Sequence, residues 1–356
     1  MSLDDEARLI LGWNNPPHGL FCRSLRNIYM KAIVCYNYGS PDVLKCEEIE
    51  KPTAGDNEVL IKVRAASVNP LDWHLMRGTP YVGRLMFGLR KPKITRPGVD
   101  VAGQVEAVGR NVTQFKQGDE VFGSCRGAFA EYACTSESAL VTKPNRVTFE
   151  QAASAPVAAF TALQGLRDKG RIQPGQKVLI NGAAGGVGTL AVQIAKSFGA
   201  DVTGVCSTRN VDMVRSIGAD RVIDYAQEDF TKSGQHYDLI FDLVANHSLL
   251  ACRRVLNPKG IYIAAGILSG SMIGLLARLI TAPVLSLFVS QKFVVLMAKR
   301  SKEDLTIMRE LMEAGKVTPV IDRRYRLSEV PEAIRYLAEG HARGKIVITL
   351  EYANQT

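Results

Sequence analysis

Short apolar runs, separated by Gly, Pro and Asp turns, cover the chain from Met30 to about Arg146. Runs of this length between turn residues are typical of β-strands rather than helices. The pattern therefore predicts an irregular β-barrel. Its expected strands lie at 32–34, 58–68, 103–108 and 120–122.

The pattern changes at about Thr148, where long helical segments begin to alternate with strand-like runs. Alternation of this kind predicts a parallel sheet with crossover helices. After Lys299 a helix, a short strand around Val320, a second helix and a final strand follow, and we expect this tail to return to the barrel. The expected strands are 178–180, 201–205, 239–242, 261–264 and 345–350, and the expected helices 189–198, 303–313 and 330–339.

One apolar segment has several interpretations. From Gly260 to Gln291 the only charged residue is Arg278, and a membrane span needs about 20 apolar residues. Pro283 and the position directly after a strand favour buried helices or an apolar lid over the active site. Peripheral membrane contact through 267–297 and a membrane span remain as alternatives.

The length and the net charge of the chain limit the classes of protein to which it could belong. A chain of 356 residues is long enough for two domains, and 46% hydrophobic content is ordinary for a soluble α/β protein. The net charge of +9 favours anionic ligands, but no nucleic-acid motif is present, so we expect a phosphorylated cofactor and no nucleic acid.

Two features bear on the compartment. The seven cysteines form no C-x-x-C pair, which is typical of free thiols in a reducing compartment, and residues 1–29 lack the pattern of a signal peptide. We therefore expect a cytoplasmic protein. Residues 1–29 are interpreted as an N-terminal extension, either an artefact of the start site or a short helix around Leu9 to Trp13 that docks on the domain.

The strongest motif is a glycine-rich turn between an expected strand and an expected helix. This context is the one that the dinucleotide-binding fingerprint requires, because the glycines let the backbone approach a pyrophosphate and the helix N-terminus presents free N–H groups. Ala183 stands where the first glycine is usual. The expected cofactor-binding residues of this turn are Ala184, Gly185, Gly186, Val187 and Gly188.

The end of the next strand selects the nucleotide. An NAD site places Asp or Glu there, whereas this chain has Ser207, Thr208 and Arg209, an anion-accepting set. The sequence therefore predicts NADPH as the cofactor. Tyr225, at the end of the following strand, is a further candidate beside the phosphate or adenine, or a plain packing residue.

Taken together, these motifs resemble the medium-chain dehydrogenase/reductase superfamily over residues 30–351. The strings 68–72, 97–103 and 159–162 resemble its zinc-free branch of quinone oxidoreductases and enone or alkenal reductases. The resemblance implies an α/β protein with a GroES-like irregular β-barrel catalytic domain and a doubly wound Rossmann sheet. Asn69, Val99–Asp100 and Val157 stand where zinc-dependent members carry their catalytic ligands, so no metal is expected.

The resemblance also implies roles for single residues. Asn69 would bond the nicotinamide ribose or substrate, with Asp72 steadying its loop, and Thr161 would lie against the nicotinamide. Val244 and Gly266 would line the ring, and Lys345 would contact the pyrophosphate. Asn69 and Asp72 could instead form a simple turn, and Lys345 a solvated strand end. His74, Tyr81 or water would supply a proton.

The expected organisation is a catalytic domain of residues 30–158 and 297–356 and a Rossmann NADPH-binding domain of residues 159–296. The expected activity is zinc-independent hydride transfer from NADPH to a small electrophilic substrate, a quinone, enone or enal, by a homodimer. One alternative is an enoyl-thioester reductase. An alternative of another class is a non-catalytic NADPH-binding or membrane-associated partner protein.

Overall fold

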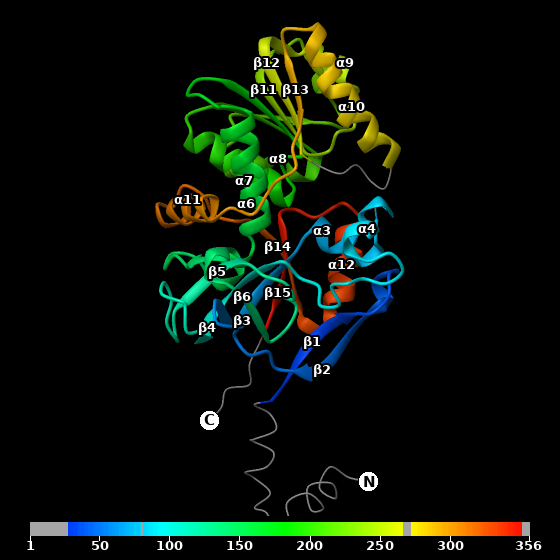
Figure 1. Ribbon diagram of the computed structural model, residues 1–356. Coiled ribbons are helices and arrows are strands. Elements are labelled where there is room, and N and C mark those ends of the chain that lie inside the picture. Colours follow the sequence, from blue (N-terminus) through cyan, green and yellow to red (C-terminus); the bar gives the residue numbers. More distant parts are fainter. Residues whose placement is uncertain (1–27, 80, 266–271, 351–356) are drawn as a thin grey trace, which may run out of the picture.

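The computed structural model describes residues 28–79, 81–265 and 272–350. Within them the chain builds two units stacked end to end (Figure 1). We call the lower one the barrel unit and the upper one the parallel unit. Most of the N-terminal extension, and Gly266, lie outside the described residues.

The barrel unit is a seven-stranded sheet, in which strands from both ends of the chain pair. Its order is β14-β15-β3-β4-β5-β7, with β6 paired to β3, and a separate ribbon of β1 and β2 lies beside it. The C-terminal strand β15 runs antiparallel to β3, which confirms that the tail returns to the barrel. Its strands are β1 (Tyr29–Cys35), β2 (Leu44–Glu50), β3 (Glu58–Val68), β4 (Asp100–Val108), β5 (Glu120–Ser124), β6 (Tyr132–Ser136), β7 (Leu140–Thr142), β14 (Ile321–Arg326) and β15 (Lys345–Thr349).

The parallel unit has six parallel strands in the order β10-β9-β8-β11-β12-β13. The chain order reverses between β8 and β11, which is the switch point where doubly wound sheets bind ligands. Its strands are β8 (Lys177–Asn181), β9 (Asp201–Cys206), β10 (Arg221–Asp224), β11 (Tyr237–Asp242), β12 (Leu256–Ala264) and β13 (Lys292–Val295).

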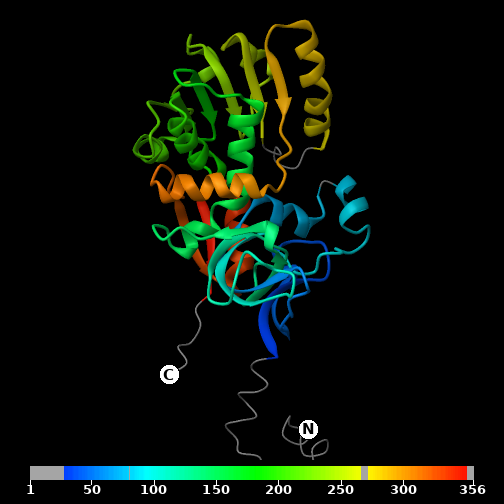
Figure 2. The same ribbon diagram turned by 60° about the vertical axis from the view of Figure 1, so that its left-hand side comes forward.

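Helices cover both faces of the parallel sheet (Figures 1 and 2). Val178 and Ile180 of β8 pack in one apolar cluster with the inner face of α7, and Leu179 packs in another with Ala282 of α10. Burial on both faces explains why these strands are continuous apolar runs. The helices are α3 (Pro70–Arg77), α4 (Arg84–Phe87), α5 (Phe149–Ala153), α6 (Pro156–Leu163), α7 (Gly186–Ser197), α8 (Val211–Ser216), α9 (Leu249–Arg254), α10 (Met272–Phe288), α11 (Lys302–Glu313) and α12 (Val330–Ala338).

The predicted strands and helices are present, with bounds that differ by a few residues. The strand expected around Val320 begins at Ile321, and the Val320 carbonyl accepts the Lys345 N–H at 2.8 Å next to the pairing of β14 with β15. The apolar segment forms α10 and is followed by β13, an edge strand that was not predicted. None of the described helices is both long and apolar enough to cross a membrane.

Candidate active site

The glycine turn predicted from the sequence lies at the carboxyl end of β8 and leads directly into α7. Gly182 adopts φ +86° in the left-handed region, and its N–H donates to Val205 of β9. A Cβ at Gly188 would approach the Gly182 carbonyl oxygen to 2.1 Å, so only glycine fits there. The close packing leaves the first N–H groups of α7 free to bind an anion.

The end of β9 carries the predicted anion-accepting residues. Ser207 is half-buried and accepts a hydrogen bond from Asn210 Nδ2 at 3.0 Å, whereas Thr208 and Arg209 are exposed. Tyr225 is exposed, and its N–H donates to the Cys206 carbonyl, which places it next to Ser207.

Residues 341–345 of the barrel unit pack against the end of β9. Of these residues, only Lys345 was predicted to belong to the site. Arg209 donates to the His341 carbonyl, and Arg343 donates through Nε to Asn210 Oδ1 at 2.7 Å and through a terminal nitrogen to the Arg209 carbonyl. Two guanidinium groups therefore flank the end of β9. Arg343 was missed because its partners lie more than a hundred residues away in the chain.

The same segment reaches the glycine turn. Gly344 forms a β-bridge with Gly185, and a Cβ on Gly186 would meet the Lys345 side chain at 2.8 Å. The residues around 341–345 thus contact both the glycine turn and the end of β9. Residues far apart in the sequence form one basic, glycine-lined edge.

Below this edge lies a buried polar network in the barrel unit, centred on Asp100. The Asp100 carboxylate accepts hydrogen bonds from Ser67 Oγ and Asn69 Nδ2, both at 2.9 Å, and from the Val157 N–H at 3.1 Å. Lys345 Nζ lies 2.6 Å from Asn69 Oδ1 and 3.5 Å from Asp100 Oδ2. These five residues bring together β3, α3, β4, α6 and β15.

Asn69 and Asp72 also form the capping box of α3. The Asn69 N–H donates to Asp72 Oδ2 at 2.8 Å, and Pro70 begins the helix. Burial raises the pKa of Asp72 to about 7, and its Oδ1 atom has no hydrogen-bond partner. Burial lowers the pKa of Lys345, against the opposing effect of the two carboxylates.

Thr161 lies one helical turn beyond Val157, half-buried, and its hydroxyl donates to the Val157 carbonyl at 2.9 Å. Val244 is partly exposed and follows Asp242, whose carboxylate accepts from the N–H groups of Val244 and Ala245. Asp242 also accepts from Asn181 Nδ2 and the Tyr262 hydroxyl. These bonds fix the loop after β11 at the switch point.

The two predicted proton donors have local contacts within the stretch from α3 to α4. His74 Nδ1 lies 3.4 Å from Thr79 Oγ1, and burial lowers the pKa of the imidazole. Tyr81 is exposed, and its ring lies against the Arg84 guanidinium. These contacts do not connect His74 and Tyr81 to the Asp100 network.

Among the described residues, no group of three or more His, Cys, Asp or Glu side chains could hold a metal ion. Asn69, Asp100 and Val157, the positions that correspond to zinc ligands in the resemblance, do come together. However, they offer one carboxylate, one amide and one backbone N–H, and the cation beside them is the Lys345 ammonium. This donor set does not fit zinc.

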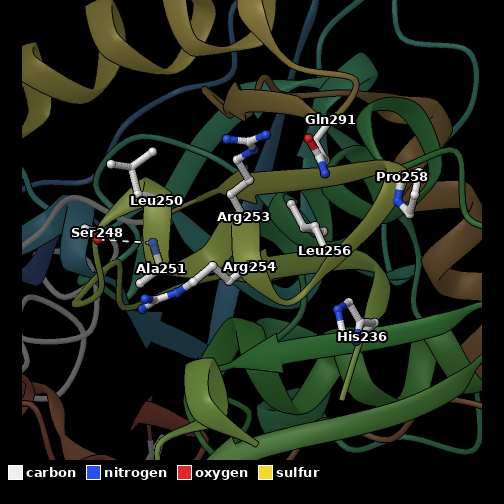
Figure 3. Close-up of a pocket in the computed structure, with 9 residues that line it drawn as sticks. All are labelled: His236, Ser248, Leu250, Ala251, Arg253, Arg254, Leu256, Pro258 and Gln291. Atoms are coloured by element: carbon white, nitrogen blue, oxygen red, sulfur yellow. Dashed lines mark hydrogen bonds between the residues drawn. The ribbon is translucent and has the colours of Figure 1, made fainter. Parts of the chain in front are cut away.

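A separate hollow lies at the outer edge of the parallel unit. Its volume is about 590 Å³, and it lies against α9 and the start of β12 (Figure 3). It is lined by His236, Ser248, Leu250, Ala251, Arg253, Arg254, Leu256, Pro258 and Gln291. None of the predicted site residues belongs to it.

The protein thus has two units, and Lys345 lies both beside the glycine turn of the parallel unit and within the buried Asp100 network of the barrel unit. Residues 55–145 match the model of the alcohol dehydrogenase GroES-like domain, and residues 217–348 match a model described as zinc-binding dehydrogenase. The chain belongs to the medium-chain dehydrogenase/reductase superfamily, in its quinone oxidoreductase and enone reductase branch, which confirms the resemblance.

Three relatives illustrate the match. The chloroplastic quinone-oxidoreductase QR1 of Triphysaria versicolor is 35% identical over 90% of this chain and 98% of its own length. The chloroplastic NADPH-dependent alkenal/one oxidoreductase of Arabidopsis thaliana is 34% identical over 90% and 79%. The solved quinone oxidoreductase of Coxiella burnetii superposes with a TM-score of 0.80 at 32% identity, covering 91% of this chain and all of that one.

Proposed function

We propose that this protein is an NADPH-dependent oxidoreductase that reduces a quinone, or the β-carbon of an α,β-unsaturated carbonyl, without zinc. The observation that carries the proposal is the Lys345 ammonium at the point where Asn69, Asp100 and Val157 meet. The ammonium lies where zinc-dependent members of the superfamily hold their metal ion. An ammonium cannot act as the Lewis acid that polarises a simple carbonyl. Substrates that accept hydride readily by themselves are therefore favoured.

The cofactor would lie between the barrel unit, residues 30–158 and 297–356, and the Rossmann unit, residues 159–296. Ala184 to Gly188 and the start of α7 would hold the pyrophosphate, since the first N–H groups of the helix have no partner within it and its N-terminus is positive. Bound NADPH supplies the hydride.

The 2′-phosphate would lie among Ser207, Thr208, Arg209 and Tyr225. We add Arg343 to this set, because its guanidinium reaches Asn210 and the backbone of Arg209 from the barrel unit. A cation contributed by the second unit makes phosphate recognition depend on the units being correctly packed.

Near the nicotinamide, the chain would act mainly by positioning and by excluding water. Thr161 and Val244 would line the ring, and Gly266 would do so from outside the described residues. Asn69 would present its loop to the ribose or substrate, since its side-chain amide already bonds Asp100 and Lys345. Lys345, whose side chain lies beside Gly186, would add positive charge near the pyrophosphate.

His74, Tyr81 and water remain the candidate proton donors. His74 is half-buried with a lowered pKa, so near neutral pH its imidazole is uncharged. Replacement by His74→Gln and Tyr81→Phe tests the two side chains separately. A large fall in kcat with one variant assigns the donor, and unchanged kcat in both assigns water.

The first experiment is oxidation of NADPH and NADH by the chelator-treated protein with a naphthoquinone, an enal, an enoyl thioester and ethanal. We expect NADPH-dependent turnover of the quinone or enal. Faster turnover of the thioester would favour the enoyl-thioester reductase. NADPH binding without turnover would favour a non-catalytic partner protein, and activity only on ethanal with added zinc would refute the metal-free assignment.

A matched pair of arginine variants tests nucleotide selection. Arg343→Gln removes a guanidinium beside the end of β9, and we expect the KM for NADPH to rise about tenfold or more, with little change for NADH. Arg110→Gln alters an exposed arginine in the barrel unit that pairs with Asp56, and is the control. Equal effects of Arg343→Gln on both nucleotides would exclude a role at the 2′-phosphate.

The oligomeric state and the cellular location complete the proposal. We infer a homodimer, because β10 and β13 end the six-stranded sheet of the described residues and either edge strand would allow two copies to pair. Light scattering should give twice the chain mass. We also infer a cytoplasmic location, because no disulfide joins the described cysteines, as is usual in a reducing compartment. Fractionation of cells would test it.

A further inference from the structure

The segment between α3 and β4 carries large apolar side chains on its surface. Around α4, Met86 is 75% exposed, and Leu85 and Leu89 are nearly as accessible. Burying such side chains is favourable by about 1.5 kcal/mol or more each, so a cluster of them in water marks a contact surface. We call residues 84–93 the basic-apolar loop.

A second exposed apolar surface lies on α10. Ile280, Val284, Leu287 and Phe288 follow the i, i+4, i+7, i+8 spacing of one helix face, and Leu287 is 82% exposed. The opposite face packs on the sheet through Ala282, Leu285 and Val289. This helix is therefore apolar on both faces, and only one face has a partner in the described structure. We call its outer residues the α10 stripe.

Both surfaces belong to intervals of the sequence that contain basic but no acidic residues. The sequence has no Asp or Glu between Asp72 and Asp100, and none between Asp242 and Glu303. The first of these intervals carries Arg77, Arg84, Arg90, Lys91, Lys93 and Arg96, and the second carries Arg253, Arg254, Lys259, Arg278, Lys292, Lys299, Arg300 and Lys302. The excess positive charge of the whole chain is thus concentrated in two acid-free segments.

The two apolar surfaces lie on the same side of the molecule. In Figures 1 and 2, α4 of the barrel unit and α10 of the parallel unit both project on the right, above and below the junction of the units, while α11 projects on the left. Lys91 and Lys93 of the basic-apolar loop are exposed. One flat partner could therefore contact both surfaces at once.

We propose that the basic-apolar loop and the α10 stripe form a docking surface for an anionic lipid bilayer. Apolar side chains would enter the boundary between headgroups and acyl chains, and the adjacent lysines and arginines would contact anionic headgroups. A second copy of the chain is a poorer occupant, because two such surfaces would bring like charges together. This proposal extends the predicted contact through 267–297 to a two-part surface that includes the barrel unit.

One consequence rests on the proposed function. A quinone carried in the bilayer would reach the junction of the two units from this side without crossing water. The binding experiment below needs no turnover, so a failure of the activity assignment would leave it intact.

The test is co-sedimentation of the full chain with vesicles of phosphatidylcholine alone or phosphatidylcholine with phosphatidylserine. We expect binding to the anionic vesicles that weakens as salt rises, because the charges are exposed and screened. Each basic residue near the surface contributes roughly fivefold in affinity. The variant Lys91→Ala/Lys93→Ala should therefore bind at least about tenfold more weakly.

The matched control is Lys169→Ala/Lys316→Ala, which removes two exposed lysines that lie outside both acid-free segments. It should bind as the unchanged protein does. Leu287→Ser/Phe288→Ser tests the apolar part, with a loss of about tenfold or more. Thermal unfolding of every variant shows that it is folded.

Three outcomes would overturn the proposal. One is the absence of binding to anionic vesicles at low salt, and another is an equal loss in the lysine variant and its control. The third is a lipid-free dimer that dissociates in Leu287→Ser/Phe288→Ser, since it would assign the α10 stripe to a second copy of the chain.

Discussion

Each unit contains a buried carboxylate with several hydrogen-bond donors, and the two carboxylates differ in whether a cation lies beside them. Asp242 of the parallel unit accepts from neutral donors of the described chain, namely the Asn181 amide, two backbone N–H groups and the Tyr262 hydroxyl. Asp100 of the barrel unit receives neutral donors and also lies 3.5 Å from the Lys345 ammonium. Both side chains have no exposed surface.

The difference reflects what each carboxylate holds together. The Asp242 bonds join β8, the loop after β11 and β12, which are neighbours in one sheet. The Asp100 bonds join segments spread from Ser67 to Lys345, and Lys345 in turn contacts the glycine turn of the other unit. A charged partner gives the second network a stronger dependence on each of its members, because a buried ion without its partner is costly.

The largest effect should follow from breaking the charged pair. Lys345→Met leaves the Asp100 carboxylate buried without a cation, and we expect the free energy of unfolding to fall by about 3–5 kcal/mol. Urea unfolding measures it. The double variant Lys345→Met/Asp100→Asn should be less destabilised than the sum of its single variants. Simple additivity would show that the two groups do not interact.

The second effect is a pH dependence that arises in the barrel unit. Because burial raises the pKa of Asp72 from 3.8 to about 7, the folded state holds a proton that the unfolded state releases. The contribution is complete below about pH 4 and is lost as the pH rises through about 7, with a slope of at most about 1.4 kcal/mol per pH unit.

Asp72→Asn should remove this slope, since the amide oxygen can still accept the Asn69 N–H bond. Urea unfolding at several pH values between 4 and 8 would compare the variant with the unchanged protein. If the slope persists in Asp72→Asn, another group causes it.

A smaller effect is expected for the neutral network. Asp242→Asn keeps an oxygen for the N–H donors and leaves no cation unpaired, so we expect a loss of about 2 kcal/mol. The matched Asp100→Asn, which leaves Lys345 without its nearest carboxylate, should lose more. Equal losses in the two variants would remove the distinction between the networks.

The smallest effect concerns a single donor. Ser67→Ala removes one hydrogen bond to Asp100, which keeps Asn69, the Val157 N–H and Lys345. We expect a loss of about 1 kcal/mol. A loss near that of Lys345→Met would mean that the hydroxyl, and not the ammonium, is the main partner of Asp100.

Much of the fold could be predicted from the sequence, because the order of apolar and polar residues along the chain reflects which strands and helix faces are buried. The strands of the parallel sheet are continuous apolar runs, since both faces are covered, and the glycine turn has a sterically defined sequence at Gly182 and Gly188. β13 was missed because its residues follow an apolar helix without a turn signal that separates strand from helix.

The candidate site was predictable only in part. The glycine turn and the end of β9 lie within one stretch of chain, so local pattern identified Ser207 and Arg209. Arg343 reaches the same place from the far end of the chain, and no periodicity or spacing records that contact. His74 and Tyr81 were plausible by position, but their side-chain contacts could be seen only in the folded chain.

The sequence by itself determined the architecture, the nucleotide-type turn and the absence of Asp and Glu from two long segments, because these follow from residue type and local order. Only the tertiary structure decided that Lys345 lies beside Asp100 and Asn69, and that α4 and α10 project on one side. Side chains from distant segments meet through packing of the two units, and electrostatic interactions act over a few ångströms of space rather than along the chain.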